Sequence, residues 1–259
     1  MIPLREQDLL KQFFAERLTG PVKVEHFTQR QLSIIVPGRE DCRFCDEVRQ
    51  MLTELRGLSP RITLQVHELS EARALAARYG VERVPATVLR GQQNRPLLIE
   101  GLPSGALFPG LVEGIAFLST GTTYLDTRTR RRLDRIRDDI QLRVFVSPTS
   151  EFSLAMMRSA LAFAIENHHV RTTIVEAEEF PRLTDAYRIR ALPFTIVGER
   201  VSFTGAVDDA TLLDQLVKVV EGHTLSAGEG LLGVTGPATP LGGLPEETVS
   251  KRGLIIPGR

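Results

Sequence analysis

The chain has 259 residues, of which 42% are hydrophobic and 25% are charged, and its 32 basic residues balance its 32 acidic residues. This composition is typical of a globular protein with room for one large domain or two ordinary ones. The zero net charge provides no overall field that would favour nucleic acid or an anionic membrane surface. No window approaches the roughly 18 unbroken apolar residues of a membrane span, and the first residues lack an apolar signal core, so we expect a cytoplasmic protein.

The first half of the chain predicts alternating helices and strands. Apolar residues recur at helical spacing in some stretches and in alternation or short runs in others. In chain order we expect a helix over residues 4–18, a half-buried strand over 22–27, a buried central strand over 32–36, a helix over 45–57, a strand over 62–66, a helix over 70–79, a hairpin over 84–99 and a closing helix over 106–118. We expect Asp41 and Ser70 to cap two of these helices and Gly80 to end one.

A joint follows at residues 121–140, where the pattern from Leu125 to Ile140 predicts a helix. Six arginines lie between positions 128 and 137. They form either a basic patch for an anionic partner or a solvated helix face whose charges are balanced by aspartates. The pairs Arg130–Asp134 and Arg135–Asp139 at i,i+4 spacing favour the solvated face.

The second half repeats the order of the first. We expect a strand over residues 142–146, a helix over 151–166, a strand over 171–176, a helix over 180–188, strands over 194–198 and 201–204, and a helix over 208–221. Adding 108 to a position in the first half recovers its counterpart: Cys42 and Ser150, Phe44 and Phe152, Cys45 and Ser153, Tyr79 and Tyr187, Pro85 and Pro193, Thr87 and Thr195. This constant offset indicates an internal duplication. Residues 223–259 are rich in Gly and Pro without periodicity, and we interpret them as a tail.

The only two cysteines of the chain, Cys42 and Cys45, form a Cys-x-x-Cys pair between an apolar run and a helix-patterned run. At the start of a helix, unpaired amides and the helix dipole favour an anion. Arg43 adds a positive charge, which Glu40 and Asp41 oppose, and we expect a lowered pKa at Cys42. In this interpretation Cys42 attacks a client disulfide and the more buried Cys45 resolves the mixed disulfide.

Two further features bear on this chemistry. Pro85 precedes a strand, where a cis peptide bond would shape the site and present the backbone of Val84 to an extended client. The alternative is an ordinary proline at the start of a strand. A Cys-x-x-Cys pair can also be half of a zinc site, but no second cysteine pair is present and no histidine stands at ligand spacing, so we expect no metal. We also expect no cofactor, because the Gly-rich segments near 228–243 do not fit a dinucleotide fingerprint.

These motifs resemble the glutaredoxin-like tandem protein disulfide oxidoreductases and the N-terminal region of the alkyl hydroperoxide reductase flavoprotein. The resemblance covers about residues 1–222 and rests on Asp41-Cys42-Arg43-Phe44-Cys45, Val84-Pro85, residues 147–153 and Leu192-Pro193-Phe194-Thr195. It implies an α/β protein with two tandem thioredoxin-like folds on one continuous sheet. The first would span residues 1–120, the second 121–222 and the tail 223–259.

The resemblance also implies exchange of disulfides with client proteins, contacts of Arg43, Phe44 and Val84 with those clients, and reduction by a thioredoxin-reductase-like flavoprotein. This chain departs from the family pattern in its second fold, where Ser150 and Ser153 replace a cysteine pair beside Pro193. The second fold is then either scaffold only or a groove that still holds clients. For the whole chain we expect a single-site thiol–disulfide oxidoreductase, and the alternative is a non-catalytic adaptor whose binding is switched by the redox state of Cys42 and Cys45.

Overall fold

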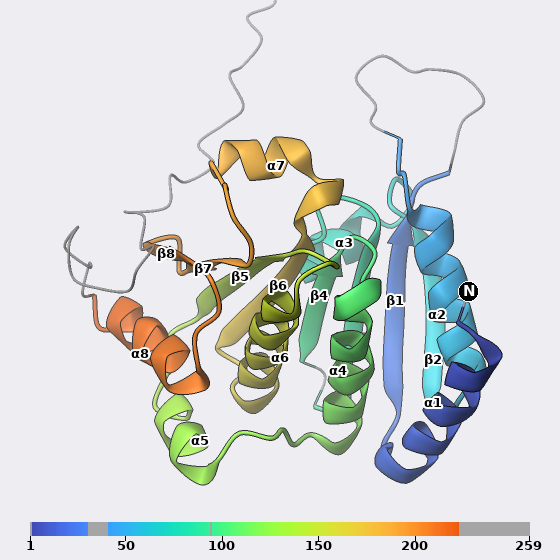
Figure 1. The fold of residues 1–259 in the computed structure, drawn as a ribbon, viewed down its shortest axis with the longest axis horizontal. Coiled ribbons are helices and arrows are strands. Elements are labelled where there is room, and N and C mark those ends of the chain that lie inside the picture. The colour runs from blue at the N-terminus through green and yellow to red at the C-terminus, as the bar shows by residue number, and fades with distance from the viewer. Residues whose placement is uncertain (1, 31–40, 94, 223–259) are drawn as a thin grey trace, which may run out of the picture.

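The computed structural model describes residues 2–30, 41–93 and 95–222, and its centre is one eight-stranded mixed sheet (Figure 1). The strand order is β2-β1-β3-β4-β6-β5-β7-β8. The strands are β1 (Val22–Thr28), β2 (Ile62–Glu68), β3 (Ala86–Arg90), β4 (Pro96–Glu100), β5 (Ile140–Val146), β6 (Val170–Glu176), β7 (Phe194–Val197) and β8 (Val201–Thr204). We call β1–β4 with their helices the first unit and β5–β8 with theirs the second unit.

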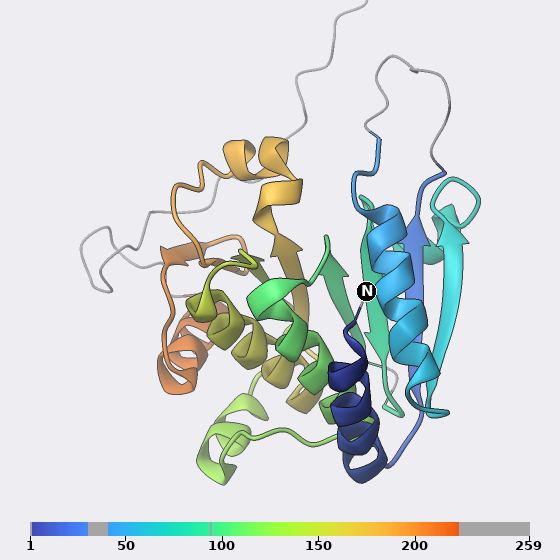
Figure 2. The same cartoon turned by 45° about the vertical axis from the view of Figure 1, so that its right-hand side comes forward.

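The helices cover the two faces of the sheet unequally. They are α1 (Leu4–Arg17), α2 (Cys45–Gly57), α3 (Arg73–Tyr79), α4 (Phe108–Thr120), α5 (Thr127–Leu133), α6 (Glu151–Glu166), α7 (Pro181–Ala186) and α8 (Asp209–Val220), with short 3-10 turns η1 (Gly105–Leu107) and η2 (Ala177–Glu179). One large apolar core, to which α1, α2, α4, α6 and α8 contribute, runs across both units on one face. On the other face, α3 and α7 each cover a small separate cluster. Figure 2 shows α2, α4 and α6 side by side over the sheet.

The two units meet along strands β4 and β6, which pair in parallel. Three Cα pairs define the register, Leu98 with Thr173, Ile99 with Ile174 and Glu100 with Val175. Above this seam α4 packs closely on α6, and a Cβ added at Gly110 would lie 2.9 Å from the sulfur of Met157. The small residue therefore permits the helix contact that merges the two apolar cores into one.

The structure confirms most predicted elements and shows the predicted element order in each unit. One predicted helix is wrong. The pattern from Leu125 to Ile140 predicted a single helix, whereas α5 ends at Leu133 and Ile140 already begins β5. The helix does not continue to Ile140, because the amide of Ile140 donates to the carbonyl of His169 and β5 then pairs in parallel with β6.

The predicted cap at Ser70 is also wrong. The helix α3 begins at Arg73, its N-cap position is Ala72, and no side chain caps it. Ser70 instead bonds the carboxylate of Glu68. The predicted end of this helix at Gly80 is correct, because Gly80 has a φ of +71° and ends α3 in the left-handed conformation.

The central strand of the first unit is β1, which pairs with β2 on one side and β3 on the other. The predicted central strand over residues 32–36 lies outside the described residues, as does the predicted tail over 223–259. Thirteen residues separate Thr28 from Cys42, whereas three separate Val146 from Ser150. The offset between the units is therefore 118 before the cysteine motif and 108 from the motif to the strand after the cis-proline, and it falls to 104 at the end of the hairpin, where Gly101 corresponds to Gly205.

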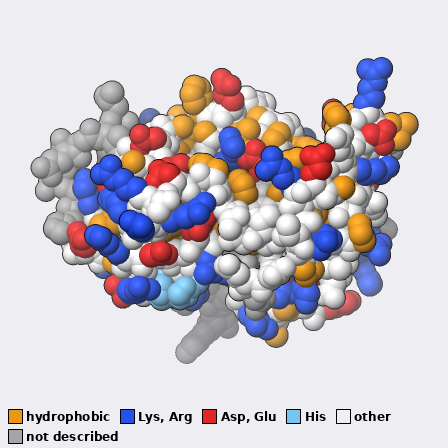
Figure 3. All heavy atoms as spheres, turned by 90° about the horizontal axis from the view of Figure 1, so that it is seen from below, with side chains coloured by type: hydrophobic (Ala, Val, Ile, Leu, Met, Phe, Trp, Pro, Cys, Tyr) orange, Lys and Arg blue, Asp and Glu red, His pale blue; other side chains and the backbone are white. Residues whose placement is uncertain are grey.

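The arginines of α5 lie on a surface that also carries acidic side chains, and Figure 3 shows both signs on the face viewed from below. Arg130 pairs with Glu166 at 3.2 Å and Arg132 pairs with Asp214 at 2.5 Å. The i,i+4 pairs predicted from the sequence do not appear among the ion pairs of the described residues, because Arg130 pairs with Glu166 and Asp139 pairs with Arg171 instead.

In the described part of the chain, none of the helices has the length and apolar character that crossing a membrane requires.

Two equivalent glycines allow a test of the seam between the units. Gly101 and Gly205 have φ values of +93° and +95°, and their amides donate to Pro85 and Pro193. A Cβ at Gly101 would lie 2.6 Å from the Cβ of Glu176 across the seam, whereas one at Gly205 meets nothing within 4 Å. We expect Gly205→Ala to lose about 1–2 kcal/mol of unfolding free energy through backbone strain alone. Gly101→Ala should lose about 1–3 kcal/mol more through overpacking.

Urea denaturation of both variants measures this difference. Equal losses in the two variants would contradict a tight seam between the units at Gly101.

Candidate functional site

The cysteine pair lies at the N-terminus of α2. Cys42 and Cys45 form a disulfide, with their Cα atoms 5.6 Å apart. Cys45 is the first residue of the helix, and Phe44 occupies the N-cap position without a side-chain cap. The predicted cap at Asp41 is therefore wrong, because three residues separate Asp41 from the first helical turn. Bonded to the first helical residue, the Cys42 sulfur lies where the unpaired amides of α2 favour an anion.

Both sulfur-bearing residues are nearly enclosed in the oxidised state. Cys42 keeps 6% of its surface exposed and Cys45 keeps 2%. Cys42 is therefore the more exposed of the two residues and Cys45 the more buried one, as their predicted roles require. An incoming thiolate would reach the disulfide most directly at Cys42.

Charged groups surround the motif on both sides. The guanidinium of Arg43 lies over the ring of Phe44, 4.9 Å from its centroid. Asp46 and Glu47 follow in the first turn of α2, and Asp46 pairs with Arg49 at 2.8 Å. Arg43 therefore supplies a positive charge between the two cysteines, while the carboxylates of the first turn oppose an anion there.

The peptide bond between Val84 and Pro85 is cis, and so is the equivalent bond between Leu192 and Pro193. Pro85 is buried and its carbonyl accepts a hydrogen bond of 2.8 Å from Gly101, while Val84 is half-buried. The loop that carries Pro85 is thus tied to the residue that follows β4, at the seam with the second unit.

A buried histidine lies behind the cysteine pair. His26, on β1, is fully buried, and its Nδ1 is 3.2 Å from the carbonyl of Ala86. Its ring also faces the backbone of Cys45, and burial lowers the pKa of His26 to about 4. Because a neutral imidazole has one N–H, it can donate to only one of these two carbonyls. In this structure the ring bonds the carbonyl of Ala86, in the strand that follows Pro85, and its buried Nε2 has no hydrogen-bond partner.

The second unit contributes side chains to the rim of this site. Glu179, on η2, accepts a hydrogen bond of 2.5 Å from the amide of Leu102. Burial raises the pKa of Glu179 to about 7, and the charges of Arg43 and Glu47 act on it from the cysteine-bearing segment. A carboxyl group of the second unit therefore lies within electrostatic range of Arg43 and Glu47 in the first.

A second contact between the units involves Arg83, two residues before Pro85. Its guanidinium donates two hydrogen bonds, of 2.9 and 2.6 Å, to the buried carboxylate of Glu100. It also lies over the ring of Phe180, which follows η2, at 6.0 Å from the centroid. Arg83, in the loop that leads to Pro85, therefore contacts Glu100 of its own unit and Phe180 of the second unit.

Ser150 and Ser153 of the second unit occupy the positions equivalent to Cys42 and Cys45, but they form hydrogen bonds instead of a disulfide. The side chain of Ser150 caps α6 by accepting from the amide of Ser153, and the hydroxyl of Ser153 accepts from the amide of Ser147 at 3.0 Å. Phe152 between them is 62% exposed. Hydrogen bonds thus replace the disulfide at this helix start, and no redox chemistry is available there.

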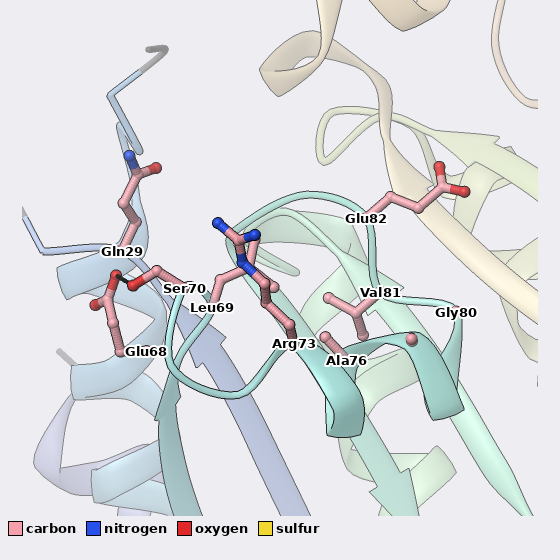
Figure 4. Close-up of a pocket in the computed structure, with 10 residues that line it drawn as sticks. Gln29, Glu68, Leu69, Ser70, Arg73, Ala76, Gly80, Val81 and Glu82 are labelled. Atoms are coloured by element: carbon pink, nitrogen blue, oxygen red, sulfur yellow. Dashed lines mark hydrogen bonds between the residues drawn. The ribbon is translucent and has the colours of Figure 1, made fainter. Parts of the chain in front are cut away.

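A groove of about 750 Å³ lies between the end of β2, the first turns of α3 and the loop that leads to Pro85. Figure 4 shows Glu68 and Ser70 on one side, Val81 and Glu82 on the other, and Arg73 between them. Within the described ranges, His, Cys, Asp and Glu side chains form no group that could hold a metal ion.

Comparison of the fold with solved structures finds tandem thioredoxin-like proteins. The alkylhydroperoxide reductase AhpF of Enterococcus faecalis shares 23% identity over 83% of this chain and 98% of the compared chain, with a TM-score of 0.73. Its separate N-terminal region gives 22% identity, 83% and 100% coverage and a TM-score of 0.73. A protein disulfide oxidoreductase of Aeropyrum pernix K1 shares 22% identity over 88% of this chain and 97% of that chain, with a TM-score of 0.75.

No protein-family model and no curated protein matches the chain. The structural similarity establishes the fold. The protein is an α/β molecule with two thioredoxin-like folds on one continuous sheet, as the sequence predicted.

The sequence analysis missed three residues near the site. His26 follows Val22 and Val24 at every second position of its strand, so its side chain lies on the same apolar face. This alternation in the sequence could have identified His26 as a buried histidine. Glu179 and Arg83 reach the site through packing between the units, and no local pattern marks them.

The buried His26 predicts a specific pH dependence of stability. Its pKa is about 4 in the folded protein and near 6.5 in the unfolded chain, so between these values the unfolded chain binds the extra proton. The contribution of His26 to the unfolding free energy therefore falls as pH drops from 6.5 to 4, by about 3 kcal/mol in total. In urea denaturation at pH 7 and pH 4, the wild-type protein should lose about 3 kcal/mol more than His26→Gln.

The exposed His168→Gln variant is the matched control and should keep the wild-type pH dependence. Parallel stability curves for the wild-type protein and His26→Gln would contradict a neutral, buried His26.

Proposed function

We propose that this protein is a thiol–disulfide oxidoreductase that acts on protein disulfides through Cys42 and Cys45. The observation that carries the proposal is the disulfide between these residues at the N-terminus of α2 in a thioredoxin-like fold. The fold match includes a protein disulfide oxidoreductase of Aeropyrum pernix K1. Redox chemistry of a dithiol pair needs no bound metal or organic cofactor.

In the reducing direction, the Cys42 thiolate attacks one sulfur of a client disulfide and forms a mixed disulfide, and the other client sulfur leaves as a thiolate. Cys45 then loses its proton, attacks Cys42 and releases the second client sulfur. The client gains two electrons and the enzyme is left with its Cys42–Cys45 disulfide. Running the same steps backwards oxidises a client dithiol, and the relative redox potentials decide the direction.

We assign the surrounding residues roles in holding the client. Val84 stands before the cis bond to Pro85 and would present its backbone to an extended client segment. Arg43 and Phe44, stacked on each other beside the disulfide, would contact the client and place a positive charge near the reacting sulfur. Pro85 shapes the loop that faces this segment.

Each reducing cycle consumes two electrons, which an external donor must restore. We propose a flavoprotein of the thioredoxin-reductase class as this donor and disulfide-containing proteins as clients. The observation favouring a redox-switched adaptor instead is that both cysteines are nearly enclosed when oxidised. In that alternative, the disulfide state changes the surface at residues 42–45 without turnover.

An insulin reduction assay with dithiothreitol tests the enzymatic proposal. The wild-type protein should accelerate insulin reduction, and Cys42→Ser should return the rate to the uncatalysed background because the attacking thiolate is gone. Cys45→Ser should instead accumulate mixed disulfides through Cys42, visible on non-reducing gels and by mass spectrometry. Leu9→Ser, on the exposed face of α1, is the control and should retain wild-type turnover.

A wild-type rate no higher than that of the Cys42→Ser, Cys45→Ser double variant would rule out the enzyme. Under that outcome, redox-dependent binding without turnover would support the adaptor.

A further inference from the structure

The second unit carries its own groove beside Ser150. This second groove has a volume of about 490 Å³ and lies between the end of β5, η2, the start of α7 and the loop that leads to Pro193. Its lining includes Ser150 and the three residues before the cis-proline, Arg190, Ala191 and Leu192. It is separate from the Cys42–Cys45 site, because every residue that lines it belongs to the second unit.

The two grooves occupy equivalent places in the two units. Of the ten residues that line the first groove, six positions (69, 70, 73, 76, 81 and 82) reappear in the lining of the second groove when 108 is added. The same offset relates Cys42 to Ser150 and Pro85 to Pro193. The second unit therefore has serines in place of the cysteines but shares the groove and the cis-proline with the first unit.

The edge of the second groove is open for backbone pairing. In the described part of the chain, the amides of Arg190, Ala191 and Leu192 take part in no backbone hydrogen bond. A segment with unpaired backbone groups next to a hollow is suited to pair with an extended polypeptide, whose alternate side chains would enter the hollow. Phe152, which is 62% exposed, follows the groove-lining Ser150 by two residues and leaves an apolar ring open to solvent near it in the chain.

The charges of the two grooves differ. Arg190 stands where the first unit has Glu82, and both residues are exposed. The carboxylate of Glu178 also lines the second groove and accepts a hydrogen bond of 2.7 Å from the hydroxyl of Ser147. Among the described residues Arg190 forms no ion pair, so its guanidinium is available to an acidic group of a ligand.

We propose that the second groove binds an extended polypeptide segment of a client protein without exchanging thiols. The segment would pair its backbone with residues 190–192, place an apolar side chain against Phe152 and set an acidic side chain near Arg190. The nature of the ligand rests on the proposed function, since the first groove holds the equivalent place in the unit that carries the redox pair. The second unit then holds a client while Cys42 reacts elsewhere on it.

A thiol-free probe separates this binding from redox turnover. The probe is fluorescein-labelled insulin B chain with carbamidomethylated cysteines, and the parent protein is the full chain with Cys42→Ser and Cys45→Ser. Fluorescence anisotropy measures the dissociation constant. Adding Phe152→Ser and Arg190→Glu, both exposed positions, should raise it at least tenfold, about 1.4 kcal/mol.

Two control variants of the same parent accompany this measurement. Leu9→Ser with Arg5→Glu makes the same chemical changes on α1, where Leu9 is 67% exposed, and should leave the dissociation constant unchanged. Phe44→Ser with Glu82→Lys changes the equivalent positions of the first unit, of which Glu82 lines the first groove, and should raise the dissociation constant less than the second-groove variant does. Circular dichroism confirms that each variant is folded.

The inference is overturned if the parent does not bind the probe, if the second-groove variant binds it as tightly as the parent, or if only the first-groove variant weakens binding. It is also overturned if size-exclusion chromatography shows that the parent is a dimer and that Phe152→Ser dissociates it, because the occupant is then a second copy of the chain. Because the probe has no exchangeable sulfur, failure of the insulin reduction assay leaves this result standing.

Discussion

The parallel pairing of β4 with β6 is the interaction on which the rest of the structure depends. It joins two four-stranded sheets into one and, with α4 packed on α6, merges their apolar cores on one face. It also carries η2, which follows β6, against the residues that follow β4, so that Glu179 bonds the amide of Leu102. Without this pairing each unit would be a small domain with an exposed sheet edge, which is a liability for aggregation.

Because β4 pairs with β6, both units contribute residues near the cysteine pair, but they contribute different groups. The first unit holds the disulfide, the buried His26 behind it and the cis bond before Pro85. The second unit contacts Arg83, two residues before Pro85, through the ring of Phe180, and its Glu179 carboxyl lies within electrostatic range of Arg43. The second unit has no cysteine pair of its own. It contacts the loop that leads to Pro85 and, in our proposal, binds clients in its own groove.

Local patterns in the sequence predicted most helices and strands, because burial on one face imposes a period of two or 3.6 residues. They failed where a non-local bond decided the outcome. Ile140 continues the helical pattern after Leu125, but its amide pairs with His169 and begins β5. The caps at Asp41 and Ser70 failed because both helices begin further along the chain than the polar residue suggests, at Cys45 and Arg73.

Residue identity and spacing are enough to identify the cysteine pair, the serines that stand in its place in the second unit and the duplication with its equivalent prolines. The strand order, the pairing of the two units and the positions of His26, Arg83 and Glu179 follow only from how the chain packs in three dimensions. The reason is physical. Periodicity states which face of an element is buried, but the partner of that face is selected by packing complementarity over the whole surface, which no local window contains.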